Sequence, residues 1–159
     1  MTTLHMNHRT EFGDGIECRQ RWMSVLAKAK PETIESLWDS VPDKPHWTFL
    51  RAPETGMVMV RARAGGTGRR FNIGEMTVTR CAVRLGNGNT GHAYIAGRDQ
   101  RHAELAAVID ALLQDPERRT ALERNIIEPL AAQQETARQT VAEKAAATKV
   151  DFFTMVRGE

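Results

Sequence analysis

The fold is decided by one stretch, residues Arg51–Arg98, which reads RAPETGMVMVRARAGGTGRRFNIGEMTVTRCAVRLGNGNTGHAYIAGR. Apolar and polar residues alternate along much of it, which is typical of strands that bury one face. Turn residues separate the alternating runs, and we predict turns at Pro53–Gly56, at Gly65–Gly68 and at Asn87-Gly88, the last of type I′. The stretch therefore predicts an antiparallel meander of three or four strands between about Trp47 and Ile95.

The alternation in this stretch changes parity twice between Phe71 and Leu85. It shifts at Gly74-Glu75 and returns after Val78. A strand can change parity only through a bulge, a break or burial on both faces. We therefore expect either an irregular sheet here or a sheet that is covered on both sides.

Helical periodicity flanks the predicted sheet on both sides. Residues 16–30 and 31–41 carry apolar side chains at helical spacing. Asp99 is placed to cap a helix over about 100–113, and Asp115-Pro116 opens another helix that Pro129 is expected to interrupt. The predicted fold class is α+β, an antiparallel β-meander flanked by N-terminal helices and by a C-terminal helical region with an extended tail.

Three regions follow from this pattern. Residues 1–15 are expected to be a flexible N-terminus, and residues 16–130 a single α+β domain. Residues 131–159 are expected to be a helical extension, because Ala, Gln, Glu and Lys dominate it and its apolar stripe is thin. Its tail carries Phe152 and Phe153, for which two interpretations stay open: docking onto a partner, or folding back onto the chain's own sheet.

Composition excludes several classes of protein. The chain has 159 residues, enough for one domain, and its net charge of +2 gives no field that favours nucleic acid or an anionic membrane. No apolar run approaches the roughly 20 residues of a membrane span, and no signal peptide is evident. The two cysteines, Cys18 and Cys81, do not form a disulfide framework. We therefore expect a cytoplasmic protein.

Arginine gathers in the middle third of the chain despite the near-neutral net charge. The candidate ligand or partner contacts among them are Arg61, Arg63, Arg69, Arg70 and Arg80. The loop Gly65–Arg70 offers free backbone N–H groups beside guanidinium groups, which suits phosphate, but it lacks the residue order of a Walker loop. A phosphate cradle and a solvated hairpin tip both stay open.

No complete catalytic set is evident. Glu75 is either a base or the ion-pair partner of a nearby arginine, and Cys81 is either a nucleophile or a small buried hydrophobe. The spacing of His46, His92 and His102 does not match a zinc site, and we expect His102 to be exposed. We therefore predict no catalytic residue and no metal ligand in this chain.

Five segments resemble the PhnG family, a subunit of the bacterial carbon–phosphorus lyase core complex. They are RQRWMSVLAKA (residues 19–29), LRAPETGMVMVRAR (50–63), FNIGEMTVTRCAVRL (71–85), GHAYIAGRD (91–99) and HAELAAVIDALLQ (102–114). The resemblance covers most of the chain, from about Arg19 to Leu130. It implies a hetero-oligomer with the H, I and J subunits, in which the I subunit is the most direct partner.

The resemblance also implies an activity for the assembly. With the H, I and L subunits, the family supports transfer of the ribose triphosphate moiety of ATP to methylphosphonate, which releases adenine and forms alpha-D-ribose 1-methylphosphonate 5-triphosphate. ATP and methylphosphonate are then substrates of the complex, and no cofactor is expected in this chain. The alternative is an enzyme or phosphate-binding subunit that uses Glu75, Arg80 and the Gly65–Arg70 loop.

Overall fold

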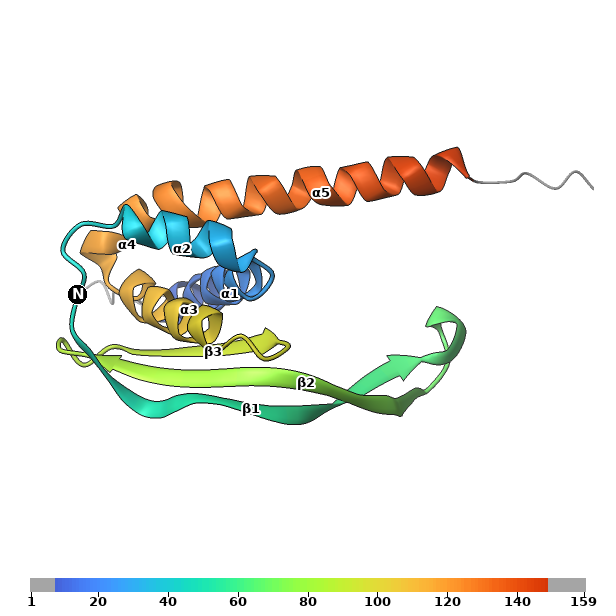
Figure 1. Ribbon diagram of the computed structural model, residues 1–159, viewed down its shortest axis with the longest axis horizontal. Helices are drawn as coiled ribbons and strands as arrows, with labels where there is room; N and C mark the ends of the chain where they lie inside the picture. Colours follow the sequence, from blue (N-terminus) through green and yellow to red (C-terminus); the bar gives the residue numbers. More distant parts are fainter. Residues whose placement is uncertain (1–7, 149–159) are drawn as a thin grey trace, which may run out of the picture.

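The structure, a computed structural model, describes residues 8–148, with side-chain surroundings from residue 15 onward. It has two layers: a three-stranded antiparallel sheet and a layer of helices on one face of that sheet (Figure 1). The strands lie in the order β1 (Trp47–Arg63), β2 (Arg70–Leu85) and β3 (Thr90–Ala96). The helices are α1 (His8–Ala27), α2 (Pro31–Asp39), α3 (Gln100–Leu113), α4 (Pro116–Leu122) and α5 (Glu128–Ala147). The predicted α+β class is confirmed.

Helix α3 is the centre of the helical layer. It contacts all three strands on one side and α1, α2 and α4 on the other. Most of its side chains are therefore buried, among them Leu105, Val108 and Ile109, which have no exposed surface. The predicted cap is confirmed, since the Asp99 carboxylate accepts a hydrogen bond of 2.8 Å from the backbone N–H of His102.

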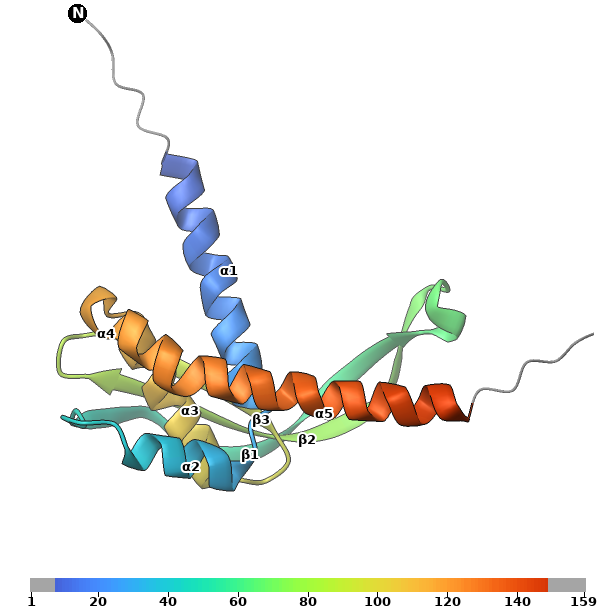
Figure 2. The same ribbon diagram turned by 90° about the horizontal axis from the view of Figure 1, so that it is seen from above.

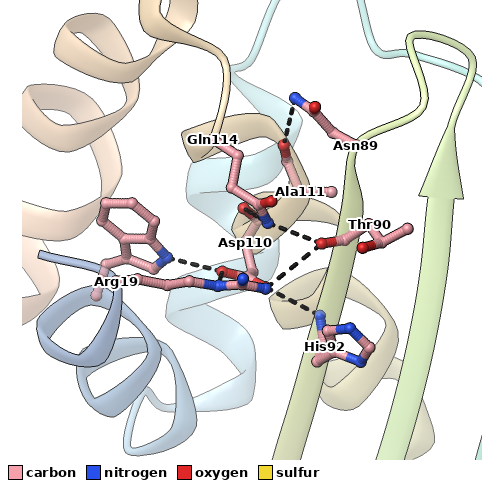
Figure 3. Close-up of polar contacts among 8 residues, drawn as sticks. Arg19, Asn89, Thr90, His92, Asp110, Ala111 and Gln114 are labelled. Carbon is pink, nitrogen blue, oxygen red and sulfur yellow. Dashed lines mark hydrogen bonds and ion pairs between the residues drawn. The ribbon is translucent and has the colours of Figure 1, made fainter. Parts of the chain in front are cut away.

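A fully buried carboxylate on α3, that of Asp110, joins three elements (Figure 3). Its Oδ1 accepts hydrogen bonds from Trp22 Nε1 at 2.8 Å and from Arg19 Nε at 3.1 Å. Its Oδ2 accepts from Arg19 Nη2 at 2.8 Å and from the backbone N–H of His92 at 2.9 Å. These four bonds fix α1 and β3 to α3, and they satisfy a charge that would otherwise be costly to bury.

Gly91 allows β3 to lie close to α3 beside this carboxylate. A Cβ atom at Gly91 would collide with the carbonyl oxygen of Ala107 and would lie 2.7 Å from the backbone nitrogen of Ala111. Gln114 adds a further link, because its Nε2 donates to the carbonyl oxygen of Thr90 at 2.8 Å (Figure 3). The helix and the strand therefore pack backbone against backbone at this point.

Strand β1 is longer than the sequence predicts. The turn expected at Pro53–Gly56 is wrong, because β1 runs through it and stays paired with β2. Register shifts between Phe49 and Arg51 and between Arg51 and Glu54 absorb the irregularity. Proline is tolerated there because β1 is an edge strand. On such a strand, a residue whose backbone N–H would point away from the sheet loses no strand-to-strand hydrogen bond when it is proline.

The parity changes of β2 have two different causes. Val60 pairs with Gly74 while Arg61 pairs with Asn72, so Ile73 is an extra residue in β2. This bulge confirms the predicted shift to within one residue. The return after Val78 is burial on both faces, since Val78 and Thr79 are both buried and the pairing with β3 stays regular.

The hairpin connections match the predicted positions but not every predicted type. Gly65 and Gly66 take φ values of 57° and 79° in the β1–β2 connection. Leu85 bonds to Asn89 across the β2–β3 connection, where Gly88 has φ of 91° and Asn87 is not among the described residues with positive φ. The predicted type I′ turn is therefore wrong. Three residues, 86–88, connect the bonded pair Leu85 and Asn89, and a connection of this length favours a type I turn followed by one left-handed residue.

Two helices also run further than expected. Helix α1 begins at His8, so the second half of the stretch predicted as flexible is helical; no proline stops it there. Pro129 does not interrupt the C-terminal helix. A π-helical turn, Glu123–Ile127, directly precedes it and widens the backbone where the proline ring would clash with the preceding turn.

His102 is buried, with 4% of its surface exposed, so the expected exposure is wrong. Its Nε2 lies 2.8 Å from the carbonyl oxygen of Leu26, because the end of α1 packs over the first turn of α3.

Helix α5 differs from α3 in its burial, because beyond Leu130 it has no buried residue. Between His8 and Thr148, no helix has both the length and the apolarity that a membrane span requires.

We expect Asp110→Asn to lower the free energy of unfolding by about 3 kcal/mol. The amide cannot accept the bonds that both carboxylate oxygens accept, and it leaves Arg19 without its counter-charge. Urea unfolding of the purified chain measures the change. Asp39→Asn is the matched control, since that side chain is 74% exposed and its loss should cost less than about 0.5 kcal/mol. Equal effects from both variants would contradict a central role for Asp110.

Candidate functional site

Strands β1 and β2 extend far beyond the helical layer. Strand β3 pairs with β2 only from Val78 to Arg84, so among the described residues the strand pairing of residues 57–77 is with each other alone. At the base of this segment, the carbonyl oxygen of Thr77 also accepts a hydrogen bond of 2.9 Å from the backbone N–H of Gly97. We call this segment the hairpin arm. It projects past the end of β3, and α5 leaves the helical layer in the same general direction (Figures 1 and 2).

The hairpin arm exposes an unusual amount of apolar surface. Its exposed large side chains, with the exposed fraction of each, are Met57 (69%), Val58 (36%), Met59 (52%), Phe71 (48%), Ile73 (56%) and Met76 (43%). A two-stranded hairpin with both edges free is marginally stable in water by itself. Contiguous apolar patches of this kind mark interaction sites. The arm is therefore the first candidate functional surface.

The candidate arginines of the sequence lie mostly on this arm. Arg61, Arg63 and Arg70 are exposed on its strands, and Arg69 is exposed in the connection between them. Arg63 and Arg70 are cross-strand partners, an arrangement of like charges that is unfavourable without an anion nearby. Within the described part of the chain, none of these four arginines forms an ion pair.

The second candidate surface lies on the face of the sheet opposite the helices. Glu54 Oε1 accepts hydrogen bonds from Arg80 Nε at 2.8 Å and from Arg51 Nη1 at 3.1 Å. Arg51 and Arg80 line a hollow of about 350 Å³, whose other lining residues are Leu50, Cys81, Ala82, His92 and Tyr94. One carboxylate thus holds two arginines at the rim of a small open cavity.

Glu75 pairs across the sheet with Met59, and it forms no ion pair with a described residue. Arg80, which one alternative places with Glu75, is bonded to Glu54. Glu75 and Arg80 lie five positions apart on one extended strand, a distance of about 17 Å. The Gly65–Arg70 loop lies beyond Glu75, at the tip of the arm. The structure therefore does not bring these three elements together.

Glu54 was missed because the sequence placed it in a turn. A signal was present: Glu54 precedes a strand of β-branched and sulfur side chains and lies three residues after Arg51. Asp110 was missed as well. It is the lone charge within the apolar run Leu105–Leu113, and a helix that is apolar nearly all round is buried, so its charge needs a partner.

Cys81 is a buried thiol. It is 2% exposed, its Sγ lies 3.5 Å from the carbonyl oxygen of Arg51, and burial raises its pKa from 9.0 to about 11, with a smaller contribution from the negative charge of Glu104. A thiol with such a pKa stays protonated at neutral pH and is a poor nucleophile. The interpretation as a small buried hydrophobe is confirmed.

In the described ranges, no group of three His, Cys, Asp or Glu side chains is arranged to hold a metal ion. Phe152 and Phe153 lie outside the described residues, so their predicted docking stays a prediction. The described candidate contacts thus divide between the hairpin arm and the hollow beside Glu54.

Sequence comparison gives these surfaces a context. The profile of the family described as "Phosphonate metabolism protein PhnG" matches residues 17–158. The chain belongs to the PhnG family. It is also similar to the alpha-D-ribose 1-methylphosphonate 5-triphosphate synthase subunit PhnG of Rhizobium meliloti (strain 1021), with 44% identity over 151 residues. The alignment covers 95% of this chain and 96% of that relative.

The match to the PhnG family reaches further than the resemblance found from motifs. It includes all of α5 and continues to residue 158, so it also covers Phe152 and Phe153. The hairpin arm and the hollow beside Glu54 both lie inside the matched residues. Both surfaces therefore belong to the part of the chain that the PhnG family shares.

Thiol labelling tests the burial of Cys81. In the folded chain at about pH 8, iodoacetamide should modify Cys18, which is exposed, and spare Cys81. Because folding raises the pKa of Cys81 from 9.0 to about 11, this thiol stabilises the folded state fully below pH 9.0 and loses that contribution as the pH rises through about 11. Labelling of Cys81 should therefore appear between these two pH values. Mass spectrometry of tryptic peptides measures both sites. Equal labelling at about pH 8 would contradict the buried thiol.

Proposed function

We propose that this chain is a subunit of the alpha-D-ribose 1-methylphosphonate 5-triphosphate synthase within a carbon–phosphorus lyase complex. The observation that carries the proposal is the relative from Rhizobium meliloti, which is named as that subunit and aligns over nearly the whole length of both chains. Family membership in phosphonate metabolism supports the same conclusion. The proposed location is the cytoplasm.

The proposed role is assembly rather than chemistry. The synthase reaction breaks the bond between adenine and the ribose C1 of ATP and joins C1 to an oxygen of methylphosphonate. It needs groups that position the triphosphate, activate the phosphonate and help adenine leave. In the described residues, Glu75 lies away from Arg80 and the Cys81 thiol is protonated at neutral pH. We therefore assign the reacting groups to other subunits.

The proposed partners are the I subunit most directly, and the H and J subunits. The resemblance implies these subunits, and the exposed apolar hairpin arm supports contact with some protein. ATP and methylphosphonate are proposed as substrates of the assembly, with no cofactor bound by this chain alone.

Reconstitution tests the subunit proposal. The H, I and L subunits should convert ATP and methylphosphonate to the ribose triphosphate product, with release of adenine, only when this chain is present. Chromatography of released adenine measures turnover, and size-exclusion chromatography measures assembly with the I subunit. Full turnover without the chain, or a stable monomer that ignores the I subunit, would contradict the proposal.

A second candidate function is phosphate binding in the hollow beside Glu54. The observation that favours it is the pair of guanidinium groups, those of Arg51 and Arg80, held by one carboxylate at the rim of an open cavity that also contains His92. An anionic ligand could replace Glu54 as their acceptor, since guanidinium groups bind phosphate with paired hydrogen bonds. In this version the chain would contribute binding groups to a site completed by another subunit.

Arg80→Gln separates the two candidates. If the hollow binds a phosphate or phosphonate group of a substrate, turnover of the intact complex should fall by about a hundredfold. Arg84→Gln is the matched control, because Arg84 is exposed on the same strand at the same parity and has no part in the hollow. Unchanged turnover in an assembled Arg80→Gln complex would remove the second candidate and leave the first intact.

A further inference from the structure

The two faces of the hairpin arm differ in chemistry. Thr79 lies on the face toward the helices, as do the core residues Cys81 and Val83 of the same parity, and its hydroxyl lies 3.4 Å from that of its cross-strand partner Thr55. Side chains alternate along a strand, and cross-strand partners share a face. The faces of the arm can therefore be assigned outward from this pair.

The face opposite the helices is apolar along the whole arm. Its members are Val58, Val60, Ala62, Phe71 and Met76, with Gly74 between them. Nearer the helical layer the same face becomes charged, since Glu54 and its cross-strand partner Arg80 follow Gly56 and Val78 on it. Val78, on the same face, is buried without belonging to the core cluster under the helices.

The other face of the arm is basic toward its tip. Arg61 and Arg63 follow Met57 and Met59 at the same parity, and Arg70 is the cross-strand partner of Arg63. Four arginines and one glutamate give residues 57–77 a net charge of +3. A surface that binds the arm must therefore offer apolar groups to one face and carboxylates to the other.

We infer that the hairpin arm is a docking element that inserts into another protein subunit with an apolar surface bordered by acidic side chains. The inference deepens the proposed function and rests on it for the existence of such a subunit. Charge decides against a second copy of this chain: a second arm would bring the same +3, and helix α5 carries a net charge of only −1. The apolar stripe decides against nucleic acid, whose affinity comes mainly from phosphate contacts.

The free edges add a second means of binding. Within residues 8–148, the outer edge of β1 along the arm has no partner strand, and β2 has none before Val78. An extended segment of the partner can therefore join the arm through backbone hydrogen bonds, while its side chains meet the two faces. We expect the fold to tolerate removal of the arm, because every residue of the core cluster lies outside it.

The decisive experiment removes the arm from the full chain. Residues 57–77 are replaced by Asn-Gly, which joins the paired residues Gly56 and Val78 through a two-residue turn. The shortened chain is produced together with the other subunits of the synthase, and co-purification is measured beside circular dichroism of the isolated chain. We expect a helical signal and a cooperative melt as in the full chain, with at least about tenfold less bound partner.

Point variants keep the arm and change its chemistry. Phe71→Ser with Met76→Ser should reduce co-purification by about tenfold, and Arg61→Glu with Arg63→Glu should do the same. Arg61→Lys with Arg63→Lys should retain most binding. The control is Ile16→Ser, which removes an exposed apolar side chain of α1, 58% exposed, away from the arm. The control should co-purify as the unchanged chain does.

The possible outcomes separate the inference from the proposal beneath it. If the unchanged chain does not co-purify with the synthase subunits, the proposed function fails and the inference fails with it. If the unchanged and the shortened chains co-purify equally, only the inference is overturned. Equal loss from the control and the Phe71/Met76 variant also overturns it, as does release of the partner by nuclease.

Discussion

The carboxylate of Asp110 is the interaction on which the arrangement of helices and sheet depends. It accepts from a side chain of α1 at one end and from the backbone of β3 at the other, and it is fully buried between them. Any other placement of α1 would leave this buried carboxylate without the donors of Arg19 and Trp22, so the charge favours one placement of the helix. The close contact at Gly91 beside it fixes the distance between α3 and β3. Together they set where the helical layer lies on the sheet.

That placement also determines what the helices leave uncovered. Helix α3 has 14 residues and spans about 21 Å, whereas the 17 residues of β1 span about 56 Å when extended. Helix α3 therefore covers only part of the long hairpin, and the hairpin arm lies beyond it. The relative from Rhizobium meliloti is named as a subunit of a synthase, and the assembly proposed for this chain would give the length of the hairpin a reason. A chain that works inside an assembly can leave to its neighbours the burial that a solitary protein must provide itself.

Much of this architecture follows from the sequence, and the failures are physical. Local signals worked: Asp99 and Asp115 cap the helices where their positions predict, and the parity shift near Gly74 marks a real bulge. Features that depend on neighbours did not. Pro53 resembles a turn residue unless the strand is known to be an edge, and Pro129 resembles a helix breaker unless a π-helical turn precedes it. The pair formed by Glu54 and Arg80 lies 26 residues apart in sequence, so only the strand register brings it together.

The unpaired edges of the hairpin arm carry a consequence for the chain before it meets any partner. Long, exposed strand edges with apolar faces are templates for edge-to-edge aggregation, and natural proteins protect them with charge. The arginines near the tip act as gatekeepers in this sense, since two arms brought edge to edge would place their positive charges side by side. The same side chains that favour the proposed acidic partner would thus keep newly made chains apart. Balanced synthesis of the chain and its proposed partner would then affect the solubility of the chain as much as the activity of the assembly.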